Sequence, residues 1–172
     1  MKTVLITGCS SGFGFELVTR YLKLHWRVFA TMRNAKERAS LFTTEIKDFP
    51  NTFHLLELDV TKREDRDRLV STLEASQISL DVVVNNAGYG LFGAFEDLSE
   101  TQIREQMEVN VYGLMLLTQG LLPLLRKSKG RIFNISSAVG YLGLPLSSMY
   151  CTSKFALAGL SDGMRAELAQ DN

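Results

Sequence analysis

An α/β fold with a doubly wound parallel sheet is predicted by two features of this 172-residue sequence. Apolar runs rich in β-branched residues alternate with helical stretches, at a spacing typical of right-handed βαβ units. Three of these runs, VLIT, LDVVVN and RIFNI, are nearly continuous in apolar character. That is expected of parallel strands covered on both faces by helices. The length suits one domain with a substantial core, and we expect residues 1–172 to form it.

The same patterns predict the individual elements. Strands are predicted at Thr3–Thr7, Arg27–Thr31, Phe53–Leu58, Leu80–Asn85 and Arg131–Ile135. Helices are predicted at Gly12–Leu24, Ala35–Ile46, Lys62–Ala75, Ser99–Lys127 and Ser148–Gln170. The helix that begins at Ser99 has the clearest start signal, because Gln102 follows three residues later as in a capping box.

Composition and charge argue against several classes of protein. Nineteen basic residues balance nineteen acidic ones, so no charge excess points to nucleic acid or an anionic membrane. The most apolar region, 109–125, is interrupted by Asn110 and Pro123 among others, which makes it a poor membrane span. The N-terminal residues MKTVLITG lack the apolar stretch of a secretory leader. We therefore expect a soluble cytoplasmic protein with no nucleic-acid partner and no membrane span.

The cysteines and histidines form no recognisable site. Cys9 and Cys151 have no histidine or second cysteine at ligand spacing, and His25 and His54 are isolated. The sequence therefore predicts neither a metal site nor a disulfide framework.

A glycine-rich loop follows the first strand and opens the first helix. A loop at this junction must turn sharply, let its backbone approach a pyrophosphate, and begin a helix whose N–H groups face the anion. The spacing Gly-x-x-x-Gly-x-Gly differs from the commonest dinucleotide fingerprint, and the alternative is a tight strand–helix connection without a ligand. Its position at the first βα junction favours a dinucleotide site. The predicted contacts are Gly8, Ser10, Ser11, Gly12, Phe13 and Gly14.

The end of the second strand indicates which dinucleotide is bound. An NAD-preferring domain usually has an acidic residue there, about 20 residues beyond the glycines, to bond the ribose hydroxyls. Here Met32 occupies that position and Arg33 follows it. A guanidinium suits a 2′-phosphate, whereas the alternative is a solvated surface charge. The sequence thus predicts NADP in preference to NAD.

Five motifs, in order along the chain, resemble those of the short-chain dehydrogenases/reductases. They are Thr7-Gly8-x-x-x-Gly12-x-Gly14, Asn85-Asn86-Ala87-Gly88, Asn110, Ser137 and Tyr150-x-x-x-Lys154. The residues within and around these motifs are most similar to those of the hydroxysteroid and retinol dehydrogenase branch. The resemblance implies a Rossmann-type domain and an oxidoreductase that transfers hydride between NADP(H) and an alcohol or ketone. Members usually run to roughly 250 residues, which implies that the last strands and the C-terminal substrate-binding third are missing here.

The catalytic group can also be argued from its chemistry. Tyr150 and Lys154 are four residues apart, so a helix places them on one face. A free phenol has a pKa near 10, and an ammonium group on the same face favours the phenolate needed for proton transfer. Ser137, at the end of the fifth strand, would hydrogen-bond the substrate oxygen. Ser136 competes for that role, and the family spacing back from Tyr150 selects Ser137.

The resemblance implies further roles. Lys154 would also bond the nicotinamide ribose, and Asn110 would hold a water linking Lys154 to solvent. The remaining contacts along the cofactor and around its adenine would be Asn86, Ala87, Gly88, Asp59 and Val60. Two alternatives stay open: Asn110 could cap a local kink as a buried polar group, and Asp59 could cap the following helix.

Substrate and partners are less well defined. Apolar residues suited to a steroid, retinoid or lipid-like substrate are Tyr89, Leu91, Tyr141, Leu142, Leu144 and Met149, with ordinary core packing as the alternative. The helices at 99–127 and 148–170 are apolar enough to predict a homodimer or homotetramer, with Leu117 and Leu121 at the interface. The alternative to an enzyme is a catalytically incomplete nucleotide-binding fragment or interaction module.

Overall fold

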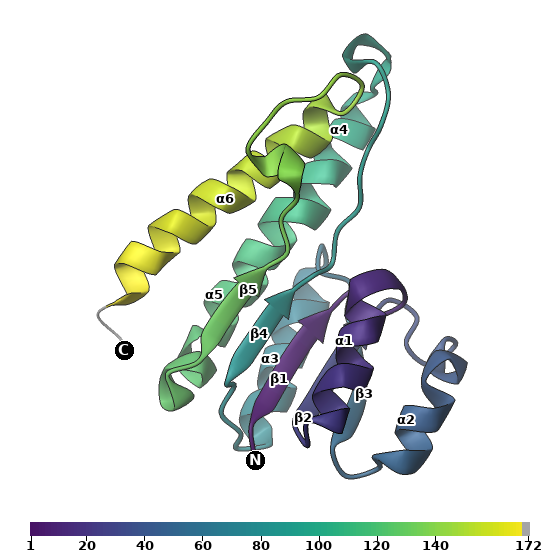
Figure 1. Ribbon diagram of the computed structural model, residues 1–172, viewed down its shortest axis with the longest axis vertical. Coiled ribbons are helices and arrows are strands. Elements are labelled where there is room, and N and C mark those ends of the chain that lie inside the picture. Colours follow the sequence, from purple (N-terminus) through teal and green to yellow (C-terminus); the bar gives the residue numbers. More distant parts are fainter. Residues whose placement is uncertain (170–172) are drawn as a thin grey trace.

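A parallel five-stranded sheet forms the centre of the computed structural model (Figure 1), which describes residues 1–169. Its strands lie in the order β3-β2-β1-β4-β5. This order reverses between β1 and β4, which opens a crevice at the carboxyl ends of those strands. The bounds are β1 Thr3–Thr7, β2 Arg27–Met32, β3 Phe53–Glu57, β4 Val82–Asn85 and β5 Arg131–Asn134.

Helices cover both faces of the sheet and enclose two apolar cores (Figure 1). One core lies under α3 Arg63–Ala75, α5 Gly113–Ser128 and α6 Ser148–Leu168, and the other under α1 Gly12–Lys23. Alternate residues of the strands enter the two cores, since Leu5 belongs to the first and Ile6 to the second. The shorter helices are η1 Ala39–Phe42, α2 Thr43–Asp48, η2 Phe95–Asp97, α4 Glu100–Met107, η3 Glu108–Tyr112 and η4 Ala138–Gly140. The predicted α/β architecture is confirmed.

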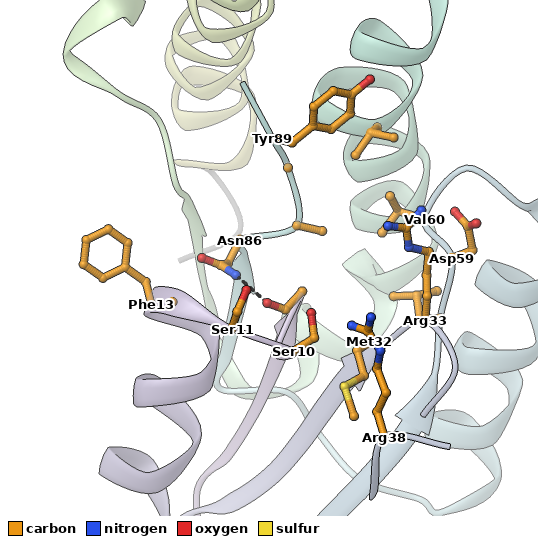
Figure 2. Close-up of a pocket in the computed structure, with 16 residues that line it drawn as sticks. Ser10, Ser11, Phe13, Met32, Arg33, Arg38, Asp59, Val60, Asn86 and Tyr89 are labelled. Carbon is orange, nitrogen blue, oxygen red and sulfur yellow. Dashed lines mark hydrogen bonds between the residues drawn. The ribbon is translucent and has the colours of Figure 1, made fainter. Parts of the chain in front are cut away.

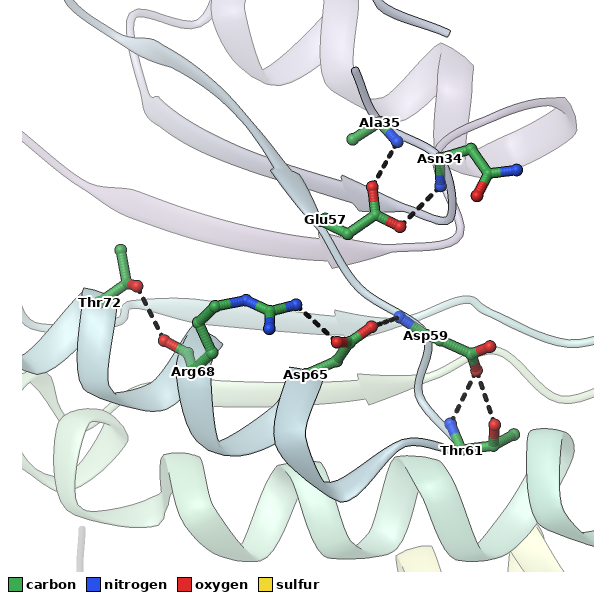
Figure 3. Close-up of polar contacts among 8 residues, drawn as sticks. All are labelled: Asn34, Ala35, Glu57, Asp59, Thr61, Asp65, Arg68 and Thr72. Atoms are coloured by element: carbon green, nitrogen blue, oxygen red, sulfur yellow. Dashed lines mark hydrogen bonds and ion pairs between the residues drawn. The ribbon is translucent and has the colours of Figure 1, made fainter. Parts of the chain in front are cut away.

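The helix predicted at Ala35–Ile46 is wrong in its first half. Turns occupy 33–38, the 3₁₀ turn η1 follows, and regular helix begins only at Thr43. Asn34 has φ 55°, and the Glu57 carboxylate accepts the N–H groups of Asn34 at 2.7 Å and Ala35 at 2.6 Å (Figure 3). These bonds to β3 hold the chain in a turn, which delays the helix.

The helix predicted at Ser99–Lys127 contains a π-helical turn. Its capping box is confirmed, because the Ser99 hydroxyl accepts the Gln102 N–H at 3.3 Å and Gln102 accepts the Ser99 N–H at 2.9 Å. α4 then passes through the π-turn η3 into α5. A π-turn widens a helix by one residue and re-aims its side chains, and here it carries Asn110. The other long helix was predicted to reach Gln170, which lies outside the described residues.

The fifth strand is covered less than predicted. β1 and β4 are buried at every residue, whereas β5 lies at the edge of the sheet. Ile132 packs against the core, but Arg131 is exposed and Phe133 is 47% exposed.

Leu117 and Leu121 are completely buried within the chain. They belong to the core that α5 forms against the sheet, so the prediction that they lie at an interface between subunits is wrong. The exposed apolar residues of this helical segment are Tyr112 and Leu116.

Within residues 1–169, only the helical stretch Glu100–Ser128 is long and apolar enough to cross a membrane. Half of its most apolar window is buried inside the protein. A core helix meets the same criteria.

Candidate active site

A cavity of about 420 Å³ occupies the crevice at the carboxyl ends of the strands (Figure 2). Every predicted cofactor contact except Gly14, Tyr150 and Lys154 lies on its wall. The lining residues are Gly8, Ser10, Ser11, Gly12, Phe13, Met32, Arg33, Arg38, Leu58, Asp59, Val60, Asn86, Ala87, Gly88, Tyr89 and Val109. The structure thus brings together residues from five parts of the sequence.

The glycine loop packs with its backbone against neighbouring backbone. Gly8 has φ +70° and Gly12 has φ +57°, a region that favours glycine. A Cβ on Gly8 would lie 2.8 Å from the Ala87 Cα, and one on Gly14 would lie 2.5 Å from the Gly8 carbonyl oxygen. Gly14 therefore does not line the cavity but makes the loop's shape possible.

The N-terminus of α1 is open toward this cavity. Its N-cap residue, Ser11, makes no side-chain capping bond, which leaves first-turn N–H groups without a side-chain acceptor. Such groups, with the helix dipole behind them, suit the pyrophosphate of a dinucleotide. Cys9 fills the space beneath the loop, where burial raises the pKa of its thiol to about 12. The residues present therefore fit a dinucleotide.

Hydrogen bonds tie the glycine loop to the segment after β4. The Thr7 hydroxyl accepts the N–H groups of Asn86 at 3.0 Å and Ala87 at 2.9 Å. The Asn86 side-chain amide donates to the Thr7 carbonyl at 2.9 Å. It also donates to the Gly8 carbonyl at 3.0 Å (Figure 2). These four bonds fix the two strand ends that form the floor of the cavity.

Two arginines stand on the wall beyond β2. Figure 2 shows Arg33 and Arg38 near Met32 and Asp59, from the turns that Glu57 holds in place. Within residues 1–169 neither guanidinium forms an ion pair. Arg38 was not predicted from the sequence, because the helix predicted over this segment gave no reason to place its side chain in the cavity. The only available signal was a second arginine five residues after Arg33.

Asp59 forms a local turn. One carboxylate oxygen accepts the Thr61 N–H at 3.0 Å and the Thr61 hydroxyl at 2.8 Å (Figure 3). The N-cap of α3 is Lys62, so the alternative that Asp59 caps this helix is wrong. The Asp65 carboxylate accepts the Asp59 N–H at 2.9 Å. Burial opposes ionisation of Asp65, but this bond and the Arg68 guanidinium hold its pKa below the usual range.

Tyr150 and Lys154 lie on one face of α6, as predicted, at the Gly88 end of the cavity. The Lys154 Nζ is 5.8 Å from the centre of the Tyr150 ring and donates to the Ile135 carbonyl at 2.8 Å. A Cβ on Gly88 would lie 3.8 Å from this Nζ. Lys154 is buried, and burial lowers the pKa of its ammonium group. The lysine thus bridges the tyrosine and the dinucleotide cavity.

The two candidate serines differ in their surroundings. The Ser136 hydroxyl is buried without a hydrogen-bond partner and lines a separate groove between β5 and α6. A Cβ on Gly140 would lie 2.8 Å from it. Ser137 is half-buried, and its hydroxyl accepts only a long bond of 3.5 Å from the Val139 N–H. The enclosed Ser136 hydroxyl thus favours Ser137 as the candidate for a substrate contact.

Asn110 is fully buried in the π-turn and joins three segments. Its amide donates to the Tyr89 carbonyl at 2.8 Å and to the Ser153 hydroxyl at 3.0 Å, and its oxygen accepts the Tyr89 N–H at 3.0 Å. Ser153 in turn donates to the Tyr150 carbonyl at 2.7 Å. The Asn110 side chain therefore connects α6 to the loop that follows Gly88.

Apolar side chains lie on two loops beyond the strands, at residues 89–95 and 141–146. Within residues 1–169, Tyr89, Tyr141, Leu142 and Leu144 are exposed, whereas Leu91 and Met149 are half-buried. The Gly93 N–H donates to the Leu146 carbonyl at 2.8 Å, which joins the loops.

Sequence reasoning missed three further residues there, namely Phe92, Phe95 and Leu146. Phe92 is 70% exposed, yet its ring centre lies 5.8 Å from that of Tyr150. No helical or strand periodicity marked these positions.

We expect Gly14→Ala to weaken dinucleotide binding in the full-length protein at least tenfold, because its methyl group would meet the Gly8 carbonyl and the Asn86 amide. Gly163→Ala is the matched control, since it is also helical and its Cβ would meet nothing within 4 Å. Isothermal titration calorimetry measures both. Equal affinity of the two variants would contradict the packing argument.

Comparisons with known proteins agree with this geometry. The family model described as short chain dehydrogenase matches residues 2–172. Bovine retinol dehydrogenase 8 is 33% identical over 99% of this chain and 55% of its own length. Human 17-beta-hydroxysteroid dehydrogenase type 1 is 36% identical over 94% of this chain and 50% of its own length.

A crystal structure of a short-chain dehydrogenase from Streptomyces avermitilis superposes with a TM-score of 0.93 and 34% identity, covering 100% of this chain and 63% of that one. The chain thus spans about half the length of the two curated relatives. From its motifs, its sheet and these similarities, the chain belongs to the short-chain dehydrogenase/reductase family of oxidoreductases.

Proposed function

We propose that the full-length protein is an NADP(H)-dependent oxidoreductase that interconverts an apolar alcohol and its ketone, with Tyr150 as general acid and base. One observation carries the proposal: Lys154 is buried between the Tyr150 ring and the Gly88 end of a cavity shaped for a dinucleotide. A nucleotide-binding module would need the cavity but not this pair. When bound, the nicotinamide supplies or accepts the hydride.

The side chains divide the remaining work. In reduction, the Tyr150 hydroxyl donates a proton to the substrate oxygen, and in oxidation it accepts one. The Ser137 hydroxyl donates a hydrogen bond to the same oxygen and orients it. The Lys154 ammonium, fixed by the Ile135 carbonyl at 2.8 Å, favours the phenolate that remains after proton donation.

The preference for NADP(H) rests on charge at the end of β2. Arg33 and Arg38 line the cavity without an ion pair among residues 1–169. Met32 stands where an acidic residue would repel a 2′-phosphate. Two guanidinium groups can bind a phosphate through charge-assisted hydrogen bonds.

The apolar nature of the substrate rests on the loops beside Tyr150. Phe92 presents an exposed ring whose centre lies 5.8 Å from that of Tyr150. Tyr141 and Leu144 are exposed apolar residues of the loop that leads into α6. Pockets for apolar ligands combine such walls with few polar groups, and here Ser137 and Tyr150 would supply them. A steroid, retinoid or lipid-like alcohol fits this chemistry.

Self-association forms part of the proposal. Three apolar side chains on this face are each about half exposed: Tyr112 in the π-turn, Leu116 in α5 and Phe155 in α6. A Cβ on Gly159 would meet nothing within 4 Å. An apolar helix pair with a small residue at its centre suits close packing against a second copy. We propose a homodimer, or a dimer of dimers, on this face.

Arg38→Ala should weaken NADPH binding by roughly tenfold to a hundredfold and leave NADH binding unchanged, because a hydrogen bond to a charged group contributes about 1.5–3 kcal/mol. Calorimetric titration of both cofactors into the full-length variant tests this. Arg165→Ala, which removes an arginine on α6 paired with Asp162, is the control. An Arg38→Ala variant that loses affinity for both cofactors equally contradicts a 2′-phosphate contact.

Tyr150→Phe should lower kcat by about 10²–10⁴-fold while NADPH binding stays within twofold of wild type, because only the proton donor is removed. Steady-state assays with apolar ketones, together with NADPH titration, provide the two numbers. Residual kcat within tenfold of wild type would mean that another group supplies the proton. A wild-type protein that binds NADPH but turns over no alcohol or ketone would favour the nucleotide-binding module.

Leu116→Asp should dissociate the dimer at micromolar concentration, because it places a charge on the exposed face of α5. Light scattering on the full-length protein measures the mass. Leu24→Asp is the control, since Leu24 is also exposed but lies at the end of α1. A strict monomer in the wild type, or an intact Leu116→Asp dimer, contradicts this interface.

A further inference from the structure

Gln106 is a fully buried glutamine in a helix whose other residues are mostly exposed. Its side chain docks on the loop that follows Gly88. The Nε2 donates to the Tyr89 carbonyl at 3.0 Å, and the Oε1 accepts the Leu91 N–H at 2.7 Å. Both ends of the amide are therefore satisfied by backbone of one short loop.

Asn110, four residues after Gln106, accepts the Tyr89 N–H and also donates to the Tyr89 carbonyl. The two amides thus bind three backbone groups of the segment 89–91. We call Gln106, Asn110 and this segment the amide clamp. Four hydrogen bonds concentrated on two loop residues, Tyr89 and Leu91, are unusual for a connection at the surface, where water normally satisfies the backbone.

Packing alone does not account for Gln106. A buried amide costs free energy unless all of its groups are paired, and an apolar side chain of similar volume would fill the space without that requirement. The Gln106 amide contributes favourable free energy only through its hydrogen bonds to the loop. Its presence in place of an apolar residue therefore points to a requirement on loop position.

The clamped loop connects the two halves of the site. Tyr89, at its start, lines the dinucleotide cavity. Phe92 follows the clamped Leu91, and the centre of its ring lies 5.8 Å from the centre of the Tyr150 ring. Gly90 lies so close that a Cβ there would come within 2.7 Å of the Phe92 ring. A shift of Leu91 would thus move the apolar wall beside the proton donor.

We propose that Gln106 is a positioning residue for the reaction: through Leu91 it sets the place of Phe92 beside Tyr150, and so controls use of the apolar substrate without affecting cofactor affinity. This role rests on the proposed function. Gln106 touches neither substrate nor cofactor, and its effect is on kcat/KM for the substrate.

The test uses Gln106→Met in the full-length protein, which keeps the side-chain length but cannot bond the loop. Thr101→Met, at an exposed position of the same helix, is the control. We expect hydrogen exchange at the Leu91 amide to quicken at least tenfold and kcat/KM for an apolar ketone to fall at least tenfold. The NADPH dissociation constant should stay within twofold of wild type, and the control should match wild type throughout.

A second variant changes a residue of the loop itself. Gly90→Ala meets only the far end of the flexible Phe92 side chain and has no left-handed backbone to strain, so it leaves the core intact. It should lower kcat/KM at least tenfold, again with NADPH affinity preserved. If Gln106→Met does not fold, this variant decides alone.

Specific outcomes overturn the proposal. The first is a hydrogen-exchange rate at the Leu91 amide that is unchanged in Gln106→Met. The second is a kcat/KM within twofold of wild type in either folded variant. The third is a loss of NADPH affinity as large as the loss of kcat/KM. A wild-type protein without turnover overturns the proposed function instead, and the Leu91 exchange rates then still report whether the amide clamp exists.

Discussion

The hydrogen bonds between the carboxyl ends of β1 and β4 are the constraint on which the rest of the site depends. Thr7 and Asn86 join the two strands where the strand order reverses. Side chains larger than hydrogen at Gly8 or Gly14 would separate these segments. Because the bonds hold the glycine loop against the segment 86–88, one cavity can reach from the N-terminus of α1 to Gly88, which lies beside Lys154.

A second layer of contacts surrounds this core and comes from residues distant in sequence. Glu57 in β3 fixes the turns that carry Arg33 and Arg38. Asn110 in the π-turn connects the loop after Gly88 to α6 through Ser153. The two ends of the cavity are thus held independently, one by a carboxylate on backbone N–H groups and the other by buried amides. Changes at one end should leave the other intact.

The sequence was sufficient for the parts of the fold that depend on local signals. Hydrophobic runs located the five strands, and the capping box at Ser99 located α4, because both follow from neighbouring residues. It failed where a distant partner overrides the local pattern. Asn34 turns because Glu57 binds its N–H. Leu117 is buried because α5 packs on the sheet.

The same distinction applies to the site. The glycines, Tyr150 and Lys154 could be identified because their spacing along the chain reflects their chemistry. Arg38, Phe92 and Gln106 could not, because each gains significance only from the cavity or loop that it meets. Polar residues that are buried in otherwise exposed helices, such as Gln106, become informative only when burial is known.

In the proposed function, one bound dinucleotide extends from the arginines beyond β2 to Tyr150 and Lys154 on α6. A crystal structure of the full-length protein grown with NADP tests this most directly. It should show the pyrophosphate against the backbone N–H groups at the start of α1, the 2′-phosphate within hydrogen-bonding distance of Arg33 or Arg38, and the nicotinamide ribose beside Lys154. Electron density for the dinucleotide outside this crevice, or with its 2′-phosphate away from both arginines, would contradict it.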